Sequence, residues 1–153
     1  MPLSVMTHEE AQVRKFYEVI WNRQDKTAIP EVLNESFLFR GSLGDEKRGR
    51  DGFAEYLDAV HAALDDYRCT IKELVVEPGK AFARMEFAGL HRGELMGVQA
   101  TGKRVWWAGA ALFHFSAGKI DSLWVLGDLK GLEAQLFKNG FIAGQTLKKH
   151  TEI

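Results

Sequence analysis

The sequence is poor in several features that define particular classes of protein. It contains a single cysteine, Cys69, which excludes an internal disulfide and allows a reducing compartment. No apolar run approaches the length of about 20 residues that a membrane-spanning helix needs. The first residues, MPLSVMTHEE, contain no basic segment followed by an apolar run, so we expect no signal peptide. We therefore expect a cytoplasmic protein without a membrane partner, in which Cys69 is a small buried hydrophobic residue.

The sequence also lacks an excess of charge of one sign. Its 20 basic and 21 acidic residues give a net charge of -1 and a pI near 6.5, so nothing indicates a nucleic acid or an anionic membrane as partner. The five histidines show no ligand spacing and have no cluster of carboxylates beside them, so we expect no metal site.

What is present is enough chain for one domain. A length of 153 residues can bury a sizeable core, and a hydrophobic content of 46% is typical of globular proteins. We expect a single domain over residues 1–140, followed by a polar tail over residues 141–153.

The N-terminal stretch carries the signature of an amphipathic helix. Thr7-His8-Glu9-Glu10 has the spacing of a capping box, in which the Thr7 hydroxyl and the Glu10 carboxylate satisfy each other's backbone donors. Apolar residues then recur at spacings of three and four: Val13, Phe16, Tyr17, Ile20 and Trp21. This stripe fits packing against a sheet, and it also allows Tyr17 or Trp21 to line a ligand cavity.

The remaining pattern predicts an α+β fold. We expect a short helix near residues 29–33, a strand over 36–40, a charged solvated loop over 41–52, a helix over 53–64, strands over 67–77, 81–91, 105–115 and 120–128, and a last helix that ends at Asn139-Gly140. The loop's glycine spacing fits neither a P-loop nor a dinucleotide fingerprint. Helices segregated from a largely antiparallel sheet indicate the α+β class.

Two polar residues fall on strand positions that are otherwise apolar. His91 ends the odd-numbered row that begins at Ala81, and Asp128 continues the even-numbered row of Ile120 and Trp124 if the strand stays regular. Both residues are candidates for acid/base chemistry in a pocket. Two structural interpretations stay open, because Asp128 directly precedes a helix that it can cap and His91 can be a hydrogen-bonded structural histidine.

The strand over residues 105–115 is apolar on both faces, and such a strand must be covered on both sides. We expect one face to line a core or pocket. The other face meets helices or a second subunit.

Several short motifs also occur in a fixed order. They are His91-Arg92-Gly93-Glu94-Leu95-Met96-Gly97, Ala100-Thr101-Gly102-Lys103, Gly118-Lys119-Ile120, Trp124-x-x-x-Asp128 and Gln135-Leu136, after Phe16-Tyr17 and Trp21-Asn22 near the N-terminus. This ordered set resembles the pattern of SnoaL-like polyketide cyclases, the ester cyclase group of the nuclear transport factor 2-like superfamily. The resemblance covers nearly the whole chain. It departs from the family pattern at Leu95, where an aromatic residue is common, and at Ala100, where proline is usual.

The resemblance implies a cone-shaped, curved antiparallel sheet wrapped around the N-terminal helices. It further implies a homodimer formed through the sheet face and an acid/base reaction without a metal or organic cofactor. In the family's enzymes the aspartate that matches Asp128 is the general acid/base of an intramolecular aldol ring closure, and the histidine that matches His91 lies in the same pocket. The expected partner is a small apolar or aromatic ligand. The residues expected to bind it are Tyr17, Trp21, Phe37, Tyr56, Phe87, Trp107 and Trp124.

Two classes of function therefore remain. The first is a cyclase-like or isomerase-like enzyme, in which a carboxyl group with a pKa near the working pH moves a proton from carbon and returns it to oxygen. The second is a non-catalytic ligand-binding or dimerisation module of the same fold. A ketosteroid-isomerase-like site has its tyrosine in Tyr17 but lacks a carboxylate at residues 37–41, and the carboxylate pair of an epoxide hydrolase is not evident.

Overall fold

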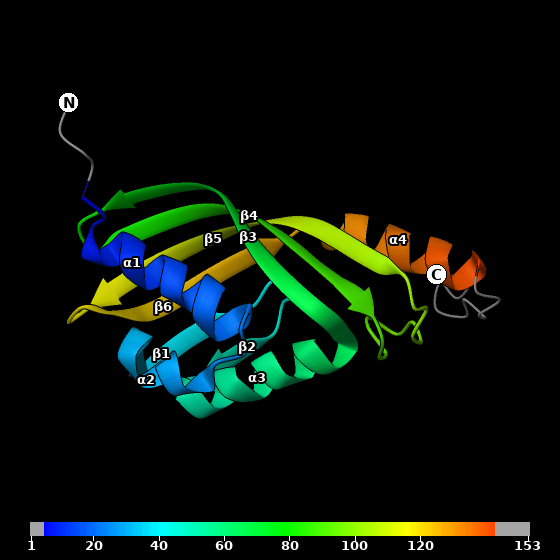
Figure 1. Cartoon of the computed structure of the whole chain (residues 1–153), viewed down its shortest axis with the longest axis horizontal. Coiled ribbons are helices and arrows are strands. Elements are labelled where there is room, and N and C mark those ends of the chain that lie inside the picture. Colours follow the sequence, from blue (N-terminus) through cyan, green and yellow to red (C-terminus); the bar gives the residue numbers. More distant parts are fainter. Residues whose placement is uncertain (1–4, 143–153) are drawn as a thin grey trace.

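The computed structural model describes residues 5–142, which form helices packed against one curved sheet (Figure 1). The helices are α1 (His8–Arg14), the π-helix η1 (Lys15–Trp21), the 3-10 helix η2 (Lys26–Ala28), α2 (Ile29–Val32), α3 (Gly49–Ala63) and α4 (Leu129–Ile142). The strands are β1 (Leu33–Arg40), β2 (Glu46–Arg48), β3 (Leu64–Glu77), β4 (Lys80–His91), β5 (Arg104–Ser116) and β6 (Lys119–Gly127). The predicted α+β class is confirmed.

The six strands follow the order β2-β1-β6-β5-β4-β3. All neighbouring pairs are antiparallel except β1 and β6, which are parallel. The sheet is therefore mixed, and the expectation of an antiparallel sheet was wrong at this pair. The physical reason is that β6 returns beside β1 only after α3 and four intervening strands, so no hairpin joins the two.

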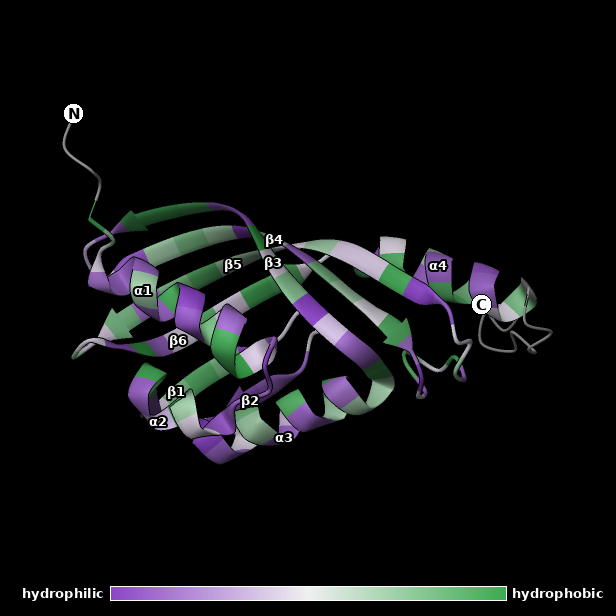
Figure 2. Ribbon diagram, in the orientation of Figure 1, coloured by the Kyte–Doolittle hydropathy of each residue, from purple (hydrophilic) through white to green (hydrophobic). Residues whose placement is uncertain are grey.

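Helices α1, α2 and α3 lie on one side of the sheet, which curves around them (Figure 1). We call this side the concave face and the opposite side the convex face. Figure 2 shows that hydrophobic residues occur along the strands as well as on the helices packed against them. Within residues 5–142, no helix is long and apolar enough to cross a membrane.

The first helix begins where the capping box predicts. The Thr7 hydroxyl accepts a hydrogen bond from the Glu10 backbone N–H at 3.1 Å, while the Glu10 carboxylate accepts one from Arg14 Nε at 2.9 Å. All five residues of the predicted apolar stripe are buried. The stripe belongs to the core of the concave face, as predicted from its spacing.

The centre of that core is aromatic. The ring of Phe53 on α3 lies 5.4 Å from Phe16, 5.1 Å from Phe39 and 5.6 Å from Trp21, measured between ring centroids. Phe37 stacks on Phe39 at 5.8 Å. Aromatic contacts of this kind contribute about 0.5–1.5 kcal/mol each beyond the burial of apolar area. Packed aromatic rings thus fill this part of the core.

The charged stretch predicted as a solvated loop contains β2, which pairs with β1. Helix α3 begins at Gly49, four residues earlier than predicted. At the other end of the chain, α4 continues past the predicted stop to Ile142. Residues 143–153 of the predicted tail lie outside the described residues.

A β-bulge in β6 changes the faces of its side chains. His114 pairs with Ser122 but Phe115 pairs with Ile120, so Asp121 is the extra residue. An extra residue reverses the alternation of side chains along a strand. Ile120 therefore points to the concave face, whereas Trp124 and Leu126 point to the convex face. The predicted single row from Ile120 to Asp128 was wrong for this reason.

Large apolar residues form a row across the convex face. The registers of β3 to β6 place Val75 opposite Phe82, Phe82 opposite Leu112, and Leu112 opposite Trp124. In β1, Arg40 pairs with Trp124 and its guanidinium lies 5.7 Å from the centre of the indole ring. Trp124 is 45% exposed, and Val75 and Phe82 are exposed as well. We call the four apolar residues together with Arg40 the convex ladder: Val75, Phe82, Leu112, Trp124 and Arg40.

Helix α4 closes the edge of β5 that β6 leaves free. The ladder between β5 and β6 ends at the pair of Gly109 and Gly127, which leaves the backbone of Trp106 without a strand partner on that side. The Gln135 side chain takes this place: its Oε1 accepts from the Trp106 N–H at 3.0 Å, and its Nε2 donates to the Trp106 carbonyl at 2.6 Å. The Gln135 side chain thus forms the two backbone hydrogen bonds that a neighbouring strand would otherwise form.

Candidate functional site

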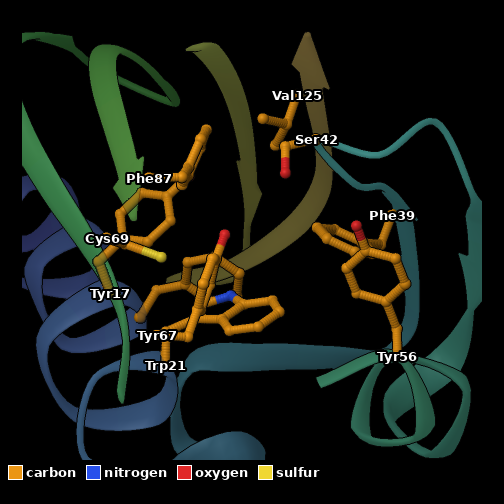
Figure 3. A pocket seen from close by; sticks show the side chains of 10 residues that line it. Tyr17, Trp21, Phe39, Ser42, Tyr56, Tyr67, Cys69, Phe87 and Val125 are labelled. Atoms are coloured by element: carbon orange, nitrogen blue, oxygen red, sulfur yellow. The ribbon is translucent and has the colours of Figure 1, made fainter. Parts of the chain in front are cut away.

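A cavity lies between η1, α3 and the concave face of the sheet (Figure 3). Ten residues line it: Phe16, Tyr17, Trp21, Phe39, Ser42, Tyr56, Tyr67, Cys69, Phe87 and Val125. In Figure 3, Phe39 and Tyr56 lie on one side of the cavity, with Trp21, Tyr67, Cys69 and Phe87 on the other. Seven of the ten lining residues are aromatic, so the cavity favours flat apolar ligands.

The cavity is narrow because its rings pack against one another. Tyr56 lies 5.1 Å from Phe39 and 6.0 Å from Trp21, while Tyr67 stacks on Phe87 with the ring planes 7° apart. The volume open to the centre of a water molecule is about 10 Å³. This is room for about one water molecule. A ring-sized ligand therefore requires at least one wall residue to move.

The buried Tyr17 hydroxyl has no hydrogen-bond partner. Tyr17 is 2% exposed, and leaving a polar group in this state costs about 1–3 kcal/mol. Burial raises the pKa of Tyr17 well above its ordinary value, and nearby Cys69 and Tyr56 act in the same direction. The phenol is therefore neutral near pH 7 and can donate a hydrogen bond.

The other two phenols of the cavity are also neutral. Burial raises the pKa of Tyr67 well above its ordinary value and that of Tyr56 to about 12. The Tyr56 hydroxyl accepts a hydrogen bond from the Leu43 backbone N–H at 3.3 Å. The cavity thus offers hydroxyl groups to a carbonyl oxygen, and these hydroxyls carry no charge that would have to be desolvated.

Cys69 is buried, as predicted, and burial raises the pKa of its thiol. Its backbone fixes η1 to β3, because the Asn22 side chain donates to the Cys69 carbonyl at 2.9 Å and accepts from its N–H at 2.8 Å. A thiol of raised pKa is a poor nucleophile at neutral pH. Cys69 therefore serves as apolar lining of the cavity.

Asp128 caps helix α4. Its Oδ1 accepts a hydrogen bond from the Gly131 N–H at 3.0 Å, and its carbonyl oxygen accepts from the Leu132 N–H at 3.1 Å. The residue is exposed and does not line the cavity. The residue before it, Gly127, packs against the backbone of Ser42, which does line the cavity. The capping interpretation is confirmed by these bonds, and the catalytic role stays a prediction.

His91 is fully buried at the end of β4. Its Nδ1 accepts a hydrogen bond from the Thr101 N–H at 3.3 Å and lies 3.0 Å from the Thr101 hydroxyl, while its buried Nε2 has no partner. Burial lowers the pKa of His91, so the neutral ring is favoured. The ring holds the connection between β4 and β5 and does not line the cavity, so its predicted catalytic role stays a prediction.

The structure brings together four of the seven residues predicted to bind the ligand: Tyr17, Trp21, Tyr56 and Phe87. Phe37 and Trp107 are buried in the adjoining core, where Trp107 lies 5.6 Å from Phe87. Trp124 lies on the convex face because of the bulge in β6. The prediction missed Phe16, Phe39, Ser42, Tyr67, Cys69 and Val125.

Apolar periodicity could have found most of the missed residues, since five of them occupy inward positions of helix or strand. Ser42 had no such signal because it follows the end of β1. Among residues 5–142, no three histidine, cysteine or acidic side chains gather closely enough to hold a metal ion.

Comparisons with known proteins place this fold in a family. A family model described as SnoaL-like polyketide cyclase matches residues 11–136. No curated protein matches the sequence.

Solved structures resemble the chain over most of its length. TsrD from Streptomyces laurentii is 25% identical, with a TM-score of 0.76 over 88% of this chain and 98% of TsrD. AclR from Streptomyces galilaeus, for which a hydroxylase activity has been suggested, is 25% identical, with a TM-score of 0.73 over 88% of this chain and 83% of AclR. A protein from Acidithiobacillus ferrooxidans, suggested to be a polyketide cyclase, shares the fold at 19% identity, with a TM-score of 0.77 over 90% and 99% of the two chains.

The family model spans the whole region from the first helix to α4, including every residue that lines the cavity. The chain therefore belongs to the SnoaL-like polyketide cyclase family.

Proposed function

We propose that this protein binds a neutral aromatic carbonyl compound in the tyrosine-lined cavity and catalyses its enolisation, as part of an aldol-type ring closure or an isomerisation. The observation that carries the proposal is the buried Tyr17 hydroxyl without a partner. A carbonyl oxygen of the ligand would accept its hydrogen bond. This would remove the cost of the unpaired hydroxyl and orient the ligand in the same contact.

The chemistry follows from a donor at the carbonyl oxygen. A base removes a proton from the carbon next to the carbonyl, and the negative charge moves to the oxygen that Tyr17 holds. In a ring closure, the enolate carbon then attacks a second carbonyl carbon of the same molecule, and the proton returns to the new alkoxide oxygen. A hydrogen bond that strengthens as the oxygen becomes charged lowers the barrier.

Asp128 is the base in this proposal. Because Asp128 does not line the cavity, its carboxylate must release the Gly131 N–H and turn towards the ligand to act, and losing a helix cap costs about 1 kcal/mol. A positioned base accelerates proton transfer by about 10² to 10⁴, or about 3–5 kcal/mol. The expected gain exceeds the cost, so capping and catalysis are compatible in one residue. The proposed role of His91 is to donate a hydrogen bond to the carbonyl as the enolate forms.

A binding protein without catalysis is the second candidate. None of the ten cavity residues is a carboxylate or a histidine, so binding by itself needs no further group. Both candidates share the Tyr17 contact, and they differ in whether a base acts on the bound ligand.

The test is proton exchange at the carbon between the two carbonyls of an aromatic β-keto ester, followed by NMR in deuterated water. The variant Asp128→Asn is the decisive one, because asparagine caps a helix about as well as aspartate but cannot act as a base. We expect it to lower the catalysed exchange by about 10² to 10⁴ while ligand binding stays intact. Tyr17→Phe should weaken both binding and exchange.

Other outcomes would overturn the proposal at different levels. Binding without any exchange above the rate in buffer would leave the binding protein. Exchange that survives Asp128→Asn would remove Asp128 as the base. A wild-type protein that binds no aromatic ketone would exclude both candidates.

We also propose that two copies of the chain pair through the convex face. The convex ladder exposes large apolar side chains over four strands, and Trp106 and Leu126 on the same sheet are 56% and 50% exposed. Apolar area of this kind favours burial in an interface. A second copy would supply an equal surface, as a two-fold dimer requires.

A further inference from the structure

A groove on the surface lies next to the buried aromatic cavity. It is lined by Leu43, Asp45, Tyr56, Ala59, Val60, Ala63, Glu94, Leu95 and Met96, and its volume open to the centre of a water molecule is about 290 Å³. Four of these residues, from Tyr56 to Ala63, occupy one face of α3 at helical spacing. The groove is therefore large enough for a ring system that the inner cavity excludes.

Tyr56 is the one residue that lines both spaces. Its ring contacts Phe39 and Trp21 on the cavity side, and its helix neighbours Ala59 and Val60 form the floor of the groove. Tyr56 thus lies between an inner space of about 10 Å³ and an outer space of about 290 Å³.

The Tyr56 ring packs directly against Gly41. A Cβ atom at position 41 would overlap the phenol carbon and oxygen of Tyr56. The ring therefore depends on the missing side chain of Gly41. In this position the Tyr56 hydroxyl accepts a hydrogen bond from the Leu43 N–H at 3.3 Å and also bonds to the Ser42 side chain. Few polar contacts have to break for the ring to leave.

The opposite wall of the groove is a tight turn. Leu95 and Val98 exchange two backbone hydrogen bonds of 2.9 Å, and Met96 and Gly97 between them have φ values of 49° and 82°. A two-residue turn with both φ values positive has little freedom to open. This wall of the groove is therefore held in place by its own backbone hydrogen bonds.

From this geometry we infer that the groove is the entrance to the cavity and that Tyr56 is its gate, seated on Gly41. The inference rests on the proposed function for the identity of the ligand, but the gate itself can be tested without a ligand. A neutral aromatic ketone would first lie on the apolar floor of α3. It would then pass as the Tyr56 ring turns away from Gly41 and Leu43.

The charges of the groove select the ligand further. Two carboxylates, Asp45 and Glu94, line it, and no basic side chain does. An anionic ligand would meet like charges there, which slows association. We therefore expect neutral naphthyl ketones to enter faster than naphthalene sulfonates of the same size.

Cys69 supplies a test that needs no ligand, because it is the chain's single thiol and lines the inner cavity. In exchange with 4,4′-dithiodipyridine, the Cys69 thiolate attacks one sulfur, a mixed disulfide forms, and 4-thiopyridone leaves and is measured by absorbance. The rate reports how often the reagent reaches the cavity.

Three variants change the gate residue Tyr56, the Gly41 on which its ring packs, and Ala59 in the groove. Tyr56→Phe removes the bonds to the Leu43 N–H and the Ser42 side chain and should speed the reaction at least about fivefold, the change expected from one hydrogen bond. Gly41→Ala displaces the ring and should speed it further. Ala59→Leu fills the exposed floor of the groove and should slow it. Ala62→Leu is the matched control, since it adds the same side chain on α3 outside the groove.

The dependence on urea separates gate opening from unfolding. A rate set by the gate changes little at low urea, whereas a rate set by global unfolding rises with the full dependence of the unfolding equilibrium. Equal rates for wild type, Ala59→Leu and Tyr56→Phe would overturn the gate. A urea dependence equal to that of global unfolding would do so as well.

A second readout separates this inference from the proposed function. Association of 6-propionyl-2-(dimethylamino)naphthalene, a neutral fluorescent ketone, is followed by stopped flow with the same variants. We expect Ala59→Leu to slow binding and Ala62→Leu to leave it unchanged. If the ketone does not bind the wild type, the proposed function fails, and the thiol rates still decide whether Tyr56 is a gate.

Discussion

The two faces of the sheet are both apolar but differ in what covers them. The concave face is sealed by η1 and α3, and residues such as Phe113 and Leu123 are buried there almost completely. The convex face carries aromatic and aliphatic side chains of similar size, and many of them are exposed. Apolar composition alone therefore did not distinguish the core from a surface. The difference arises from which face the chain can cover with its own helices.

The largest expected effect concerns how much each face of the sheet contributes to the free energy of unfolding. Phe53→Ala removes a ring from the centre of the concave core and should lower the free energy of unfolding by about 3–5 kcal/mol. Phe82→Ala removes the same ring from the convex ladder and should change the stability of the monomer by less than about 0.5 kcal/mol. Urea denaturation at low protein concentration measures both. Equal losses would contradict the comparison.

The second prediction concerns the proposed pairing of convex faces. Trp124→Glu places a charge in the convex ladder beside Arg40, where pairing would desolvate it, and should weaken the dimer at least about tenfold. Trp124→Phe keeps an aromatic ring and should have a much smaller effect. Sedimentation over a range of concentrations measures the dissociation constants. A wild-type protein that stays monomeric at every concentration would remove the dimer.

The third prediction concerns the edge of β5 where the Gln135 side chain bonds to the backbone of Trp106. Gln135→Ala leaves the N–H and the carbonyl of Trp106 to water and should cost about 1–3 kcal/mol, since two hydrogen bonds are lost. Gln135→Glu keeps an acceptor for the N–H and should cost less. Urea denaturation gives the energies, and hydrogen exchange at the Trp106 amide shows whether the loss is local. Unchanged amide exchange in Gln135→Ala would contradict the role of Gln135.

The smallest effect is a pH dependence that arises on the buried side. Burial lowers the pKa of His91, so below its ordinary value of about 6.5 the unfolded chain binds more protons than the folded one. The contribution of His91 to stability is complete above that value and is lost as the pH falls towards its folded pKa. The slope is at most about 1.4 kcal/mol per pH unit for one group.

His91→Asn tests this assignment, because asparagine can accept from the Thr101 N–H but does not titrate. Urea denaturation between about pH 7.5 and pH 5.5 should show a shallower slope in the variant than in the wild type. His61 contributes in the same direction, since burial lowers its pKa too, so some slope should remain. An unchanged slope would show that His91 does not titrate differently in the folded chain.

The spacing of apolar residues predicted the helices and long strands well, because each of them buries one face. The stripe from Val13 to Trp21 and the inward row of β4 were both confirmed by burial. Trp124 was placed on the wrong face, because the bulge at Asp121 inserts one residue without any local sequence signal. The alternation of apolar and polar residues in the sequence does not reveal where a bulge adds one residue to a strand.

The cavity was predicted in part for a related reason. Tyr17 and Trp21 belong to a periodic helix, and their inward direction follows from spacing. Ser42 enters the cavity from a loop, where no periodicity applies. Capping by Asp128 was one of two interpretations that its place before a helix left open, while its place relative to the cavity depends on how β6 and α4 are joined.

The short strand β2 has a consequence for the shape of any assembly. It forms one edge of the sheet, and all three of its residues, Glu46, Lys47 and Arg48, are charged. Natural sheets prevent the addition of further strands by short, charged edges. Growth of the sheet into a fibre is disfavoured at this edge. The proposed pairing of convex faces, by contrast, would close the assembly at two chains.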